Sequence, residues 1–435
     1  MDIYPKIKLT IMTCLLFSTQ NIYALLTPLA LFFIAIEIGL CLLYKRNYIT
    51  FPEAIANFGT AIGNQTVNVL IAAGVYVIYG YLWDNYRFIE TIPMTWYNWL
   101  LLLLSIDFIF YWVHRWGHEV NILWAAHSPH HSAEEMNFFV ALRASVTQRL
   151  FSFMFFWPLT LIGFKPFDIY MMTAIHLFIS FLHHTEFIPK LWRWIEFIFT
   201  TPSHHRVHHG VNFKYLDKNY GEFLIIWDRI FGSFEEETDK VVYGMYSHPQ
   251  TWNPIIINFH YYNMLWKDAV AADNWWDKIR IWFMPLGWCP ANLPPKPPLV
   301  EITVQNQQRL TVNPMPFSKP YLILSAIFGV SLMMLIISPQ TTWNNVERIV
   351  GSILLWHLII NWSGILESKQ WLFASEIIRI ALTLPILIAF SHLLDKPIWL
   401  AVLILYSICC LFWTVKYFRL KIDPPSVKPS KMGVV

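Results

Sequence analysis

Long apolar stretches alternate with shorter polar segments along most of the chain. A helix needs about 20 mostly apolar residues to span a hydrocarbon core, and several stretches approach that length. Two shorter pieces, 150–163 and 168–184, could form a helical hairpin that enters the bilayer without fully crossing it. The pattern predicts an all-α, multi-pass membrane helical bundle. The expected spans lie near residues 23–44, 66–84, 97–113, 321–338, 349–366, 372–393 and 397–417.

The composition agrees with a membrane protein. The chain is 56% hydrophobic and only 14% charged, whereas soluble domains average about 25% charged residues. The net charge of +3 is too small to indicate a nucleic-acid partner. The five cysteines have no C-x-x-C spacing and lie mostly in apolar segments. We therefore expect neither a disulfide framework nor a zinc ribbon.

The same pattern divides the chain into five expected parts. One part holds every histidine motif, and a region rich in Trp and Pro follows it. Within that region the run PANLPPKPPLV (290–300) predicts an extended linker. The parts are N-terminal transmembrane segments (1–96), a catalytic region (97–240), a cytoplasmic connection (241–318), a C-terminal transmembrane bundle (319–418) and a basic tail (419–435).

Lysine and arginine positions predict the orientation, because they are enriched in cytoplasmic loops. Lys45 and Arg46 close the first span, and counting two further spans from them brings the chain back to the same side at His114. The basic tail agrees with this count. We therefore expect the histidine motifs to face the cytoplasm. Lys6 and Lys8 precede an apolar run without a convincing cleavage site, so we expect an uncleaved amphipathic lead-in.

Histidines are concentrated in one stretch of the chain. Of the 16 histidines, 12 lie between His114 and His209. They form an H-x-x-x-H motif at 114–118 and H-x-x-H-H triplets at 127–131 and 205–209. Spacings of three and four place side chains on one helix face. The first motif should extend the third span. Pro129 should break or begin a helix, and Thr201 or Ser203 could cap a helix that starts at Pro202.

Metal coordination explains two such triplets better than packing does. Clustered histidines repel one another when charged and need hydrogen-bond partners when buried. A metal ion binds the neutral imidazoles and is itself the partner of their ring nitrogens. The number of imidazoles fits two ions with three to five ligands each. Imidazole suits zinc, copper, iron and nickel, so the donors alone do not identify the metal. The membrane setting makes oxidation of an apolar chain by oxygen a candidate chemistry for such a site. Oxidising a C–H bond needs a redox-active metal, which zinc is not.

Nearby acids and polar residues are candidates for orienting the ligands. Asp107 is suggestive because a carboxylate inside an apolar span is costly and usually functional. Glu134 and Glu135 are more typical of a solvated surface. Asn137 and Arg143 could bind a ligand head group or a neighbouring carboxylate, or they could make ordinary structural hydrogen bonds. Carboxylates able to accept an imidazole N–H are Asp107, Glu119, Glu134, Glu135, Glu186 and Asp228.

Five histidines lack a motif partner, and we expect them outside the metal site: His176, His248, His260, His357 and His392. Two adjacent pairs are ambiguous. Either His183 or His184 faces the metals, and either His204 or His205 does.

At these motifs the sequence resembles the fatty acid hydroxylase/sterol desaturase superfamily, over roughly residues 100–240. Within it, HEVN after the first motif, the HHTE segment and VVYG at 241–244 are similar to the alkylglycerol monooxygenases. The resemblance implies a membrane oxidoreductase with two iron ions that uses O2 to oxidise a lipid C–H bond. It implies Glu119 as a functional acid. The implied iron ligands are His114, His118, His127, His130, His131, His184, His205, His208 and His209.

The closer resemblance also implies a substrate and an electron donor. The substrate would be an ether-linked alkylglycerol, hydroxylated beside the ether oxygen so that the hemiacetal collapses to an aldehyde and glycerol. Tetrahydrobiopterin would supply electrons, although no residue pattern points independently to a pterin site. We recognise no fused electron-transfer module and expect a separate donor or a bound reductant.

Three alternatives remain open at this point. A sterol desaturase or fatty acid hydroxylase acting on another lipid would use the same ligands. A His-lined metal transporter would need polar residues inside many spans, but several spans here are almost free of ionisable residues. Haem binding through paired histidines would leave most of the set unused.

Overall fold

The computed structural model describes residues 26–311, 317–338, 341, 343–390 and 397–422. Helices dominate these residues, which contain isolated β-bridges but no strand. The all-α prediction is confirmed. The chain forms two compact units, Met1–Leu310 (unit 1) and Thr311–Val435 (unit 2). The five-part division stays a prediction. The N-terminal lead-in, most of the basic tail and His392 lie outside the described residues.

Six helices are long and apolar enough to span a membrane, which confirms most of the predicted spans. The predicted hairpin arm at 168–184 and the predicted span at 397–417 correspond to two shorter apolar stretches, Pro166–Leu182 and Leu400–Lys416. The six helices are Leu26–Leu43, α2 (Phe51–Tyr86), α3 (Trp96–Glu119), α14 (Ser318–Ile337), α15 (Asn345–Leu366) and α16 (Leu372–Ala389).

Helix α2 is longer than the span predicted at 66–84. It contains 36 residues, about 54 Å at 1.5 Å per residue, whereas the hydrocarbon core is about 30 Å thick. Its first half carries buried polar side chains, including Glu53, Asn57 and Asn64. These side chains lower the local hydropathy, and for that reason the apolar pattern begins later than the helix does.

The predicted hairpin differs from the structure in its first arm. Residues 150–163 form the end of α6 (Gln148–Phe153) and a separate short helix, α7 (Trp157–Ile162), in place of one continuous helix. Pro158 lies in the first turn of α7, where proline is tolerated because that turn's N–H groups need no helical partner. Gly163, with φ of 115°, ends the helix. The second arm is the single helix α8 (Pro166–Leu182).

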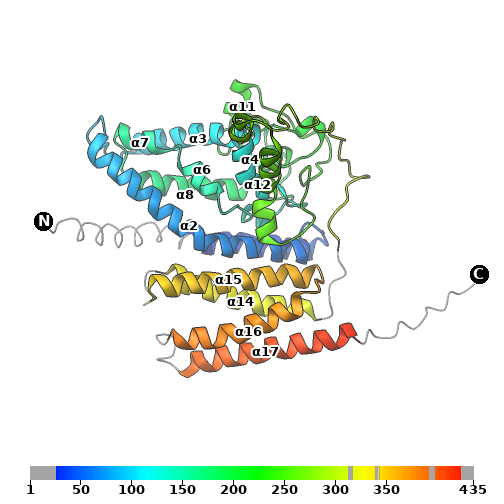
Figure 1. The fold of residues 1–435 in the computed structure, drawn as a ribbon. Coiled ribbons are helices and arrows are strands. Elements are labelled where there is room, and N and C mark those ends of the chain that lie inside the picture. The colour runs from blue at the N-terminus through cyan, green and yellow to red at the C-terminus, as the bar shows by residue number, and fades with distance from the viewer. Residues whose placement is uncertain (1–25, 312–316, 339–340, 342, 391–396, 423–435) are drawn as a thin grey trace, which may run out of the picture. The chain divides into compact units, whose positions relative to one another are not determined.

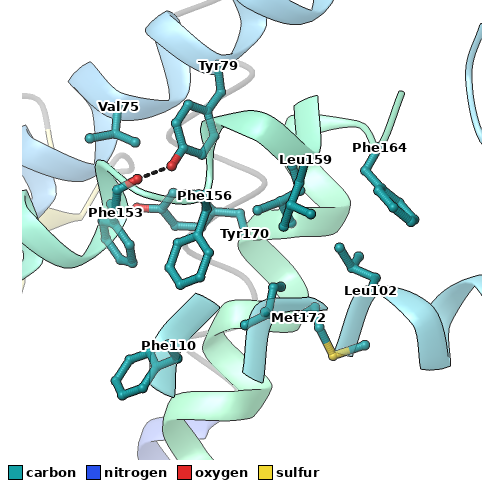
Figure 2. Packing of buried hydrophobic residues seen from close by; sticks show 12 residues of the cluster. Val75, Tyr79, Leu102, Phe110, Phe153, Phe156, Leu159, Phe164, Tyr170 and Met172 are labelled. Atoms are coloured by element: carbon teal, nitrogen blue, oxygen red, sulfur yellow. Dashed lines mark hydrogen bonds between the residues drawn. The ribbon is translucent and has the colours of Figure 1, made fainter. Parts of the chain in front are cut away.

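An apolar core joins these helices in unit 1 (Figure 2). Val75 and Tyr79 extend from α2, and Leu102, Ile106 and Phe110 extend from α3. The Tyr79 hydroxyl donates a hydrogen bond to the carbonyl of Phe153, so its polar end is satisfied inside the core. The remaining core side chains come from α6 to α8 and their connections: Phe153, Phe156, Leu159, Phe164, Ile169, Tyr170 and Met172.

Short helices complete unit 1 beside the long ones (Figure 1). Helix α12 packs against α4 through Leu265, Ala269 and Ala125. Part of the Trp- and Pro-rich region is therefore folded onto unit 1, while residues 294–300 contain no helix or strand. These helices are α4 (Asn121–His131), α5 (Phe138–Ala141), α9 (Arg193–Ile198), α10 (Pro202–His208), the 3-10 helix Phe213–Tyr215, α11 (Ile226–Phe231), α12 (Pro254–Ala271) and α13 (Trp275–Arg280).

Unit 2 is a bundle of α14, α15, α16 and α17 (Pro397–Ile422). A buried ion pair between Glu376 and Arg379 lies inside it. The hydroxyl of Tyr321 and the amide of Asn361 donate to the same carboxylate, and Arg379 also donates to Tyr406. The network links all four helices of unit 2.

Candidate metal centre

Four segments of unit 1 carry the predicted ligands. Helix α3 ends one residue after His118, so the prediction that the third span continues through the first motif is confirmed. Helix α4 runs through Pro129 to His131, so the predicted break at this proline is wrong. Pro129 lies in the last turn, where it removes one backbone hydrogen bond but does not end the helix before His131.

Helix α10 begins at Pro202, as predicted. The predicted side-chain cap is absent, because the Thr201 hydroxyl donates instead to Glu196, at 2.8 Å. The helix still presents its triplet on one face, as the spacing of three and four requires.

The structure brings the nine predicted ligands together in two groups. Within each group one ring nitrogen per histidine lies within 4.8 Å of the others, and every member is buried. Group one contains His114, His118, His127, His131 and His208. Group two contains His130, His184, His205 and His209.

Ring nitrogens in group two face one another without a proton between them. Nδ1 of His130 lies 3.1 Å from the carbonyl of Arg143, and Nδ1 of His184 lies 3.0 Å from the carbonyl of Ser180. A carbonyl oxygen only accepts, so both Nδ1 atoms carry the hydrogen and both Nε2 atoms hold a lone pair. These two Nε2 atoms are 3.2 Å apart. Two facing lone pairs repel unless a cation lies between them.

Group one has the same arrangement. Nδ1 of His114 donates to the carbonyl of Tyr220 at 2.9 Å, and Nδ1 of His208 donates to that of Lys218 at 3.1 Å. Both Nε2 atoms are therefore acceptors. The buried Nε2 atoms of His118 and His208 have no hydrogen-bond partner. Carbonyls that fix the tautomer and turn the other nitrogen inward are typical of metal-binding histidines.

A proton cannot take the place of the cation. Burial lowers the pKa of His130 to about 4, and it lowers the pKa values of His184, His205 and His209 well below the ordinary histidine value. The imidazoles are thus neutral at physiological pH and are in the form that binds metals. The donor set fits two transition-metal ions, one in each group.

The predicted acid Asp107 is a buried anchor that contacts neither group. Its two carboxylate oxygens accept hydrogen bonds from the backbone N–H groups of Phe223 and Leu224, at 3.0 and 3.2 Å, and from the Trp227 indole, at 2.8 Å. The ring of His176 is 2.8 Å away on the other side. Asp107 therefore holds the 223–227 segment against α3.

Glu119 and Glu186 also lie outside the two groups. Glu119 is exposed and accepts a hydrogen bond from Arg115 at 2.8 Å. Glu186 accepts from the hydroxyl of Tyr243 at 2.6 Å. The functional role implied for Glu119 and the candidate role of Glu186 stay predictions.

Asn137 and Arg143 each contact a carboxylate, one of the options predicted. The Asn137 amide donates to Glu135 at 3.0 Å, and Arg143 donates to Glu53 at 3.1 Å. Arg143 reaches the site only through its backbone carbonyl, which orients His130. The interpretation of Glu134 and Glu135 as solvated residues is wrong, because they are only 6% and 8% exposed.

The structure separates the ambiguous histidine pairs. His184 belongs to group two, whereas His204 pairs with Glu196 at 2.9 Å and His205 belongs to group two. His183 lies with His205 and Glu222 in a third set of close ring and carboxylate atoms.

Two acids near the site were missed by the sequence analysis. Glu222 is buried, and one of its oxygens is 3.5 Å from Nδ1 of His114. Asp217 is 3.9 Å from Nδ1 of His118. Both lie between α10 and α11 in a segment without helical periodicity, so spacing gave no signal for either.

A cavity of about 270 Å³ borders both groups. Its wall contains His114 and His127 from group one and His130 and His184 from group two. Much of the remaining wall is apolar: Phe110, Val113, Leu123, Phe151, Phe153, Phe156, Leu177, Phe178 and Phe181.

The fatty acid hydroxylase family model matches residues 99–233, a range that contains both groups. Alkylglycerol monooxygenase of Homo sapiens is 38% identical over 384 residues, which is 84% of this chain and 82% of that protein. The chain belongs to the alkylglycerol monooxygenase family. It is therefore an enzyme of a family of lipid-acting oxidoreductases and, with its apolar helices, an integral membrane protein. Fatty acid hydroxylases are iron-dependent, in agreement with the histidine groups.

Further similarities agree with this family. Alkylglycerol monooxygenase of Xenopus tropicalis is 37% identical over 57% of this chain and 55% of that protein. An ornithine lipid hydroxylase of Rhizobium tropici is 33% identical over 31% of this chain and 41% of that protein. No solved structure gives a significant match.

Proposed function

We propose that this chain is a di-iron monooxygenase that uses O2 to hydroxylate the carbon beside the ether oxygen of an alkylglycerol lipid. The observation that carries the proposal is the set of facing imidazole lone pairs in two adjoining groups, bordered by an apolar cavity. Bound iron would supply the oxidising chemistry that zinc lacks.

The overall reaction balances with an external donor of two electrons. One oxygen atom enters the C–H bond, and the other leaves as water after taking up two protons and two electrons. The product is a hemiacetal, which collapses to a fatty aldehyde and glycerol. We propose tetrahydrobiopterin or a separate electron-donor protein as the source of the electrons.

The chain's own residues orient the ligands and exclude water. Carbonyls of Tyr220, Lys218, Arg143 and Ser180 fix the histidine tautomers before any metal binds. The apolar wall formed by residues such as Phe110 and Phe181 would hold an alkyl chain against the histidines. Displacement of water from this wall favours a hydrophobic tail over a polar substrate.

We also propose that the site faces the cytoplasm. Lys45 and Arg46 follow the helix Leu26–Leu43. Helices α2 and α3 then cross and return, so His114 would lie on the side of these basic residues. Labelling of a cysteine introduced at exposed Lys45 by a membrane-impermeant reagent tests this. Labelling in intact cells would contradict a cytoplasmic position.

A hydroxylase acting on another lipid is the second candidate. The similarity to an ornithine lipid hydroxylase, 33% identical over 137 residues, favours it. Both candidate functions would use the same metal ligands, so only assays with different lipid substrates can distinguish them.

The test is product analysis with labelled oxygen. Purified protein in detergent would be given an alkylglycerol, 18O2 and tetrahydrobiopterin, and the aldehyde would be trapped by immediate reduction. We expect 18O in the resulting fatty alcohol. The matched control is the ester-linked acylglycerol, which lacks the ether CH2 group. Iron-loaded protein that makes no labelled product from the ether, or oxidises both lipids equally, would contradict the proposal.

A further inference from the structure

Glu222 is a buried acid that borders both histidine groups. It is only 4% exposed. One carboxylate oxygen lies 3.5 Å from Nδ1 of His114, which belongs to group one. The carboxylate also lies within 4.8 Å of ring nitrogens of His183 and of His205, which belongs to group two. Glu222 is thus the described acid that is close to ligands of both groups.

Three buried polar atoms in this set have no hydrogen-bond partner: Nδ1 of His183, Nδ1 of His205 and Oε2 of Glu222. Nε2 of His205 lies 3.0 Å from Nε2 of His184, whose lone pair points toward it. For His205 to bind the same cation, its Nε2 must also be a lone pair and its Nδ1 must carry the hydrogen. That N–H needs an acceptor, because an unsatisfied buried donor costs free energy.

Neighbouring acids hold the backbone on both sides of Glu222. Asp228 accepts the N–H groups of Tyr220 and Gly221, both at 2.7 Å. Asp107 accepts the N–H of Phe223 at 3.0 Å. These bonds hold the backbone segment that carries two groups of the site. One is the Tyr220 carbonyl that orients His114, and the other is the side chain of Glu222.

We propose that Glu222 is a positioning residue that couples the two groups. Its carboxylate accepts the Nδ1 hydrogen of His205, directly or through one water molecule, while it remains beside Nδ1 of His114. A carboxylate behind a ligating histidine fixes the tautomer and makes the ring a stronger donor to the metal. The proposal rests on the proposed function only in that both groups hold metal.

The test compares Glu222→Gln with Glu236→Gln in full-length, iron-loaded protein. Gln keeps the size of the side chain and removes its charge. Glu236 is an exposed carboxylate that pairs with Lys190, and it serves as the matched control. We expect two irons per chain in both variants, with release of one iron to a chelator about 10- to 100-fold faster in Glu222→Gln, as is usual for loss of such a partner. We also expect a lower kcat with an unchanged KM, because Glu222 lines the cavity and Gln keeps the size of its side chain there.

Glu222→Asp keeps the charge and guards against misfolding of the Gln variant. Its iron release should lie between that of the unchanged protein and that of Glu222→Gln. Release equal to that of the unchanged protein in both variants would overturn the proposal. A third ion in the unchanged protein that is lost in Glu222→Gln would also overturn it, because Glu222 would then be a ligand. Iron release is measured without lipid, so failure of lipid oxidation contradicts only the proposed function.

Discussion

Buried polar groups occur in both units, but they are satisfied in different ways. In unit 2 the carboxylate of Glu376 meets donors from Arg379, Tyr321 and Asn361, and each donor faces an acceptor. In unit 1 the Nε2 lone pairs of His130 and His184 face each other. The first arrangement is complete within the described chain, whereas the second requires a cation.

This difference separates a structural network from a functional site. Hydrogen-bonded polar groups inside a membrane bundle can fix helix pairing without any ligand. The ring nitrogens that face one another in the histidine groups are acceptors, oriented by backbone carbonyls. They have no hydrogen-bond donor among the described residues of the site. Burial of charged or polar residues is therefore a weak sign of function by itself, and the match between donors and acceptors is more informative.

Loss of one ligand should produce the largest effect. We expect His205→Ala to lower activity by at least about 1,000-fold, equivalent to roughly 4 kcal/mol or more of transition-state stabilisation. The iron bound to group two should decrease together with the activity, because only three of its four histidines would remain. Activity and iron analysis would be measured together. His260→Ala, outside both groups, is the control, and equal loss in the two variants would show a general folding defect.

Breaking the unit 2 network should destabilise the protein without removing iron. Arg379→Met leaves Glu376 buried without its counter-ion, which we expect to cost about 3–5 kcal/mol of stability. Thermal unfolding in detergent measures this cost. Adding Glu376→Leu should recover most of it, since a buried pair can often be replaced by apolar residues. Loss of iron in the double variant would contradict the assignment of this network as structural.

Asp107→Asn tests an anchor that lies behind the site. The Asn amide would direct N–H groups at donors that now bind a carboxylate, and we expect a stability loss of about 3 kcal/mol. Because Asp107 holds the segment that carries Glu222, iron release should also become faster. An unchanged unfolding temperature would show that the segment is held in place by other contacts.

Glu119→Gln should have the smallest effect on structure. Its exposed pair with Arg115 contributes about 0.5 kcal/mol at most, and no group-one ring bonds to it. Iron content should therefore be unchanged. Loss of activity with full iron would support the predicted catalytic role of Glu119, whereas loss of iron would contradict its position outside the metal centre.

The local parts of the site were predictable from the sequence. Spacings of three and four identified the helix faces on α3, α4 and α10, and the apolar pattern located the helices that hold them. The assignment of His127 and His131 to one group and of His130 to the other was not predictable. It depends on how α4 packs against α3, α6 and α12, which periodicity does not determine.

The supporting residues were harder to predict, because they act over long sequence distances. Asp107 is unusual as a carboxylate inside an apolar span, yet its hydrogen-bond partners lie 69 to 120 residues away in the sequence. Glu222 was missed because it lies in an irregular segment held by Asp107 and Asp228. Neither contact leaves a local pattern in the sequence.

The most direct test of the central claim is the number of iron ions per chain. Protein from iron-replete cells would be purified in detergent, exchanged into metal-free buffer and measured by elemental analysis together with Mössbauer spectroscopy. We predict two iron ions per chain in nitrogen-rich coordination, corresponding to the two histidine groups. Full occupancy by zinc alone would contradict this account. So would only one iron ion in the unchanged protein that is retained in full in His205→Ala.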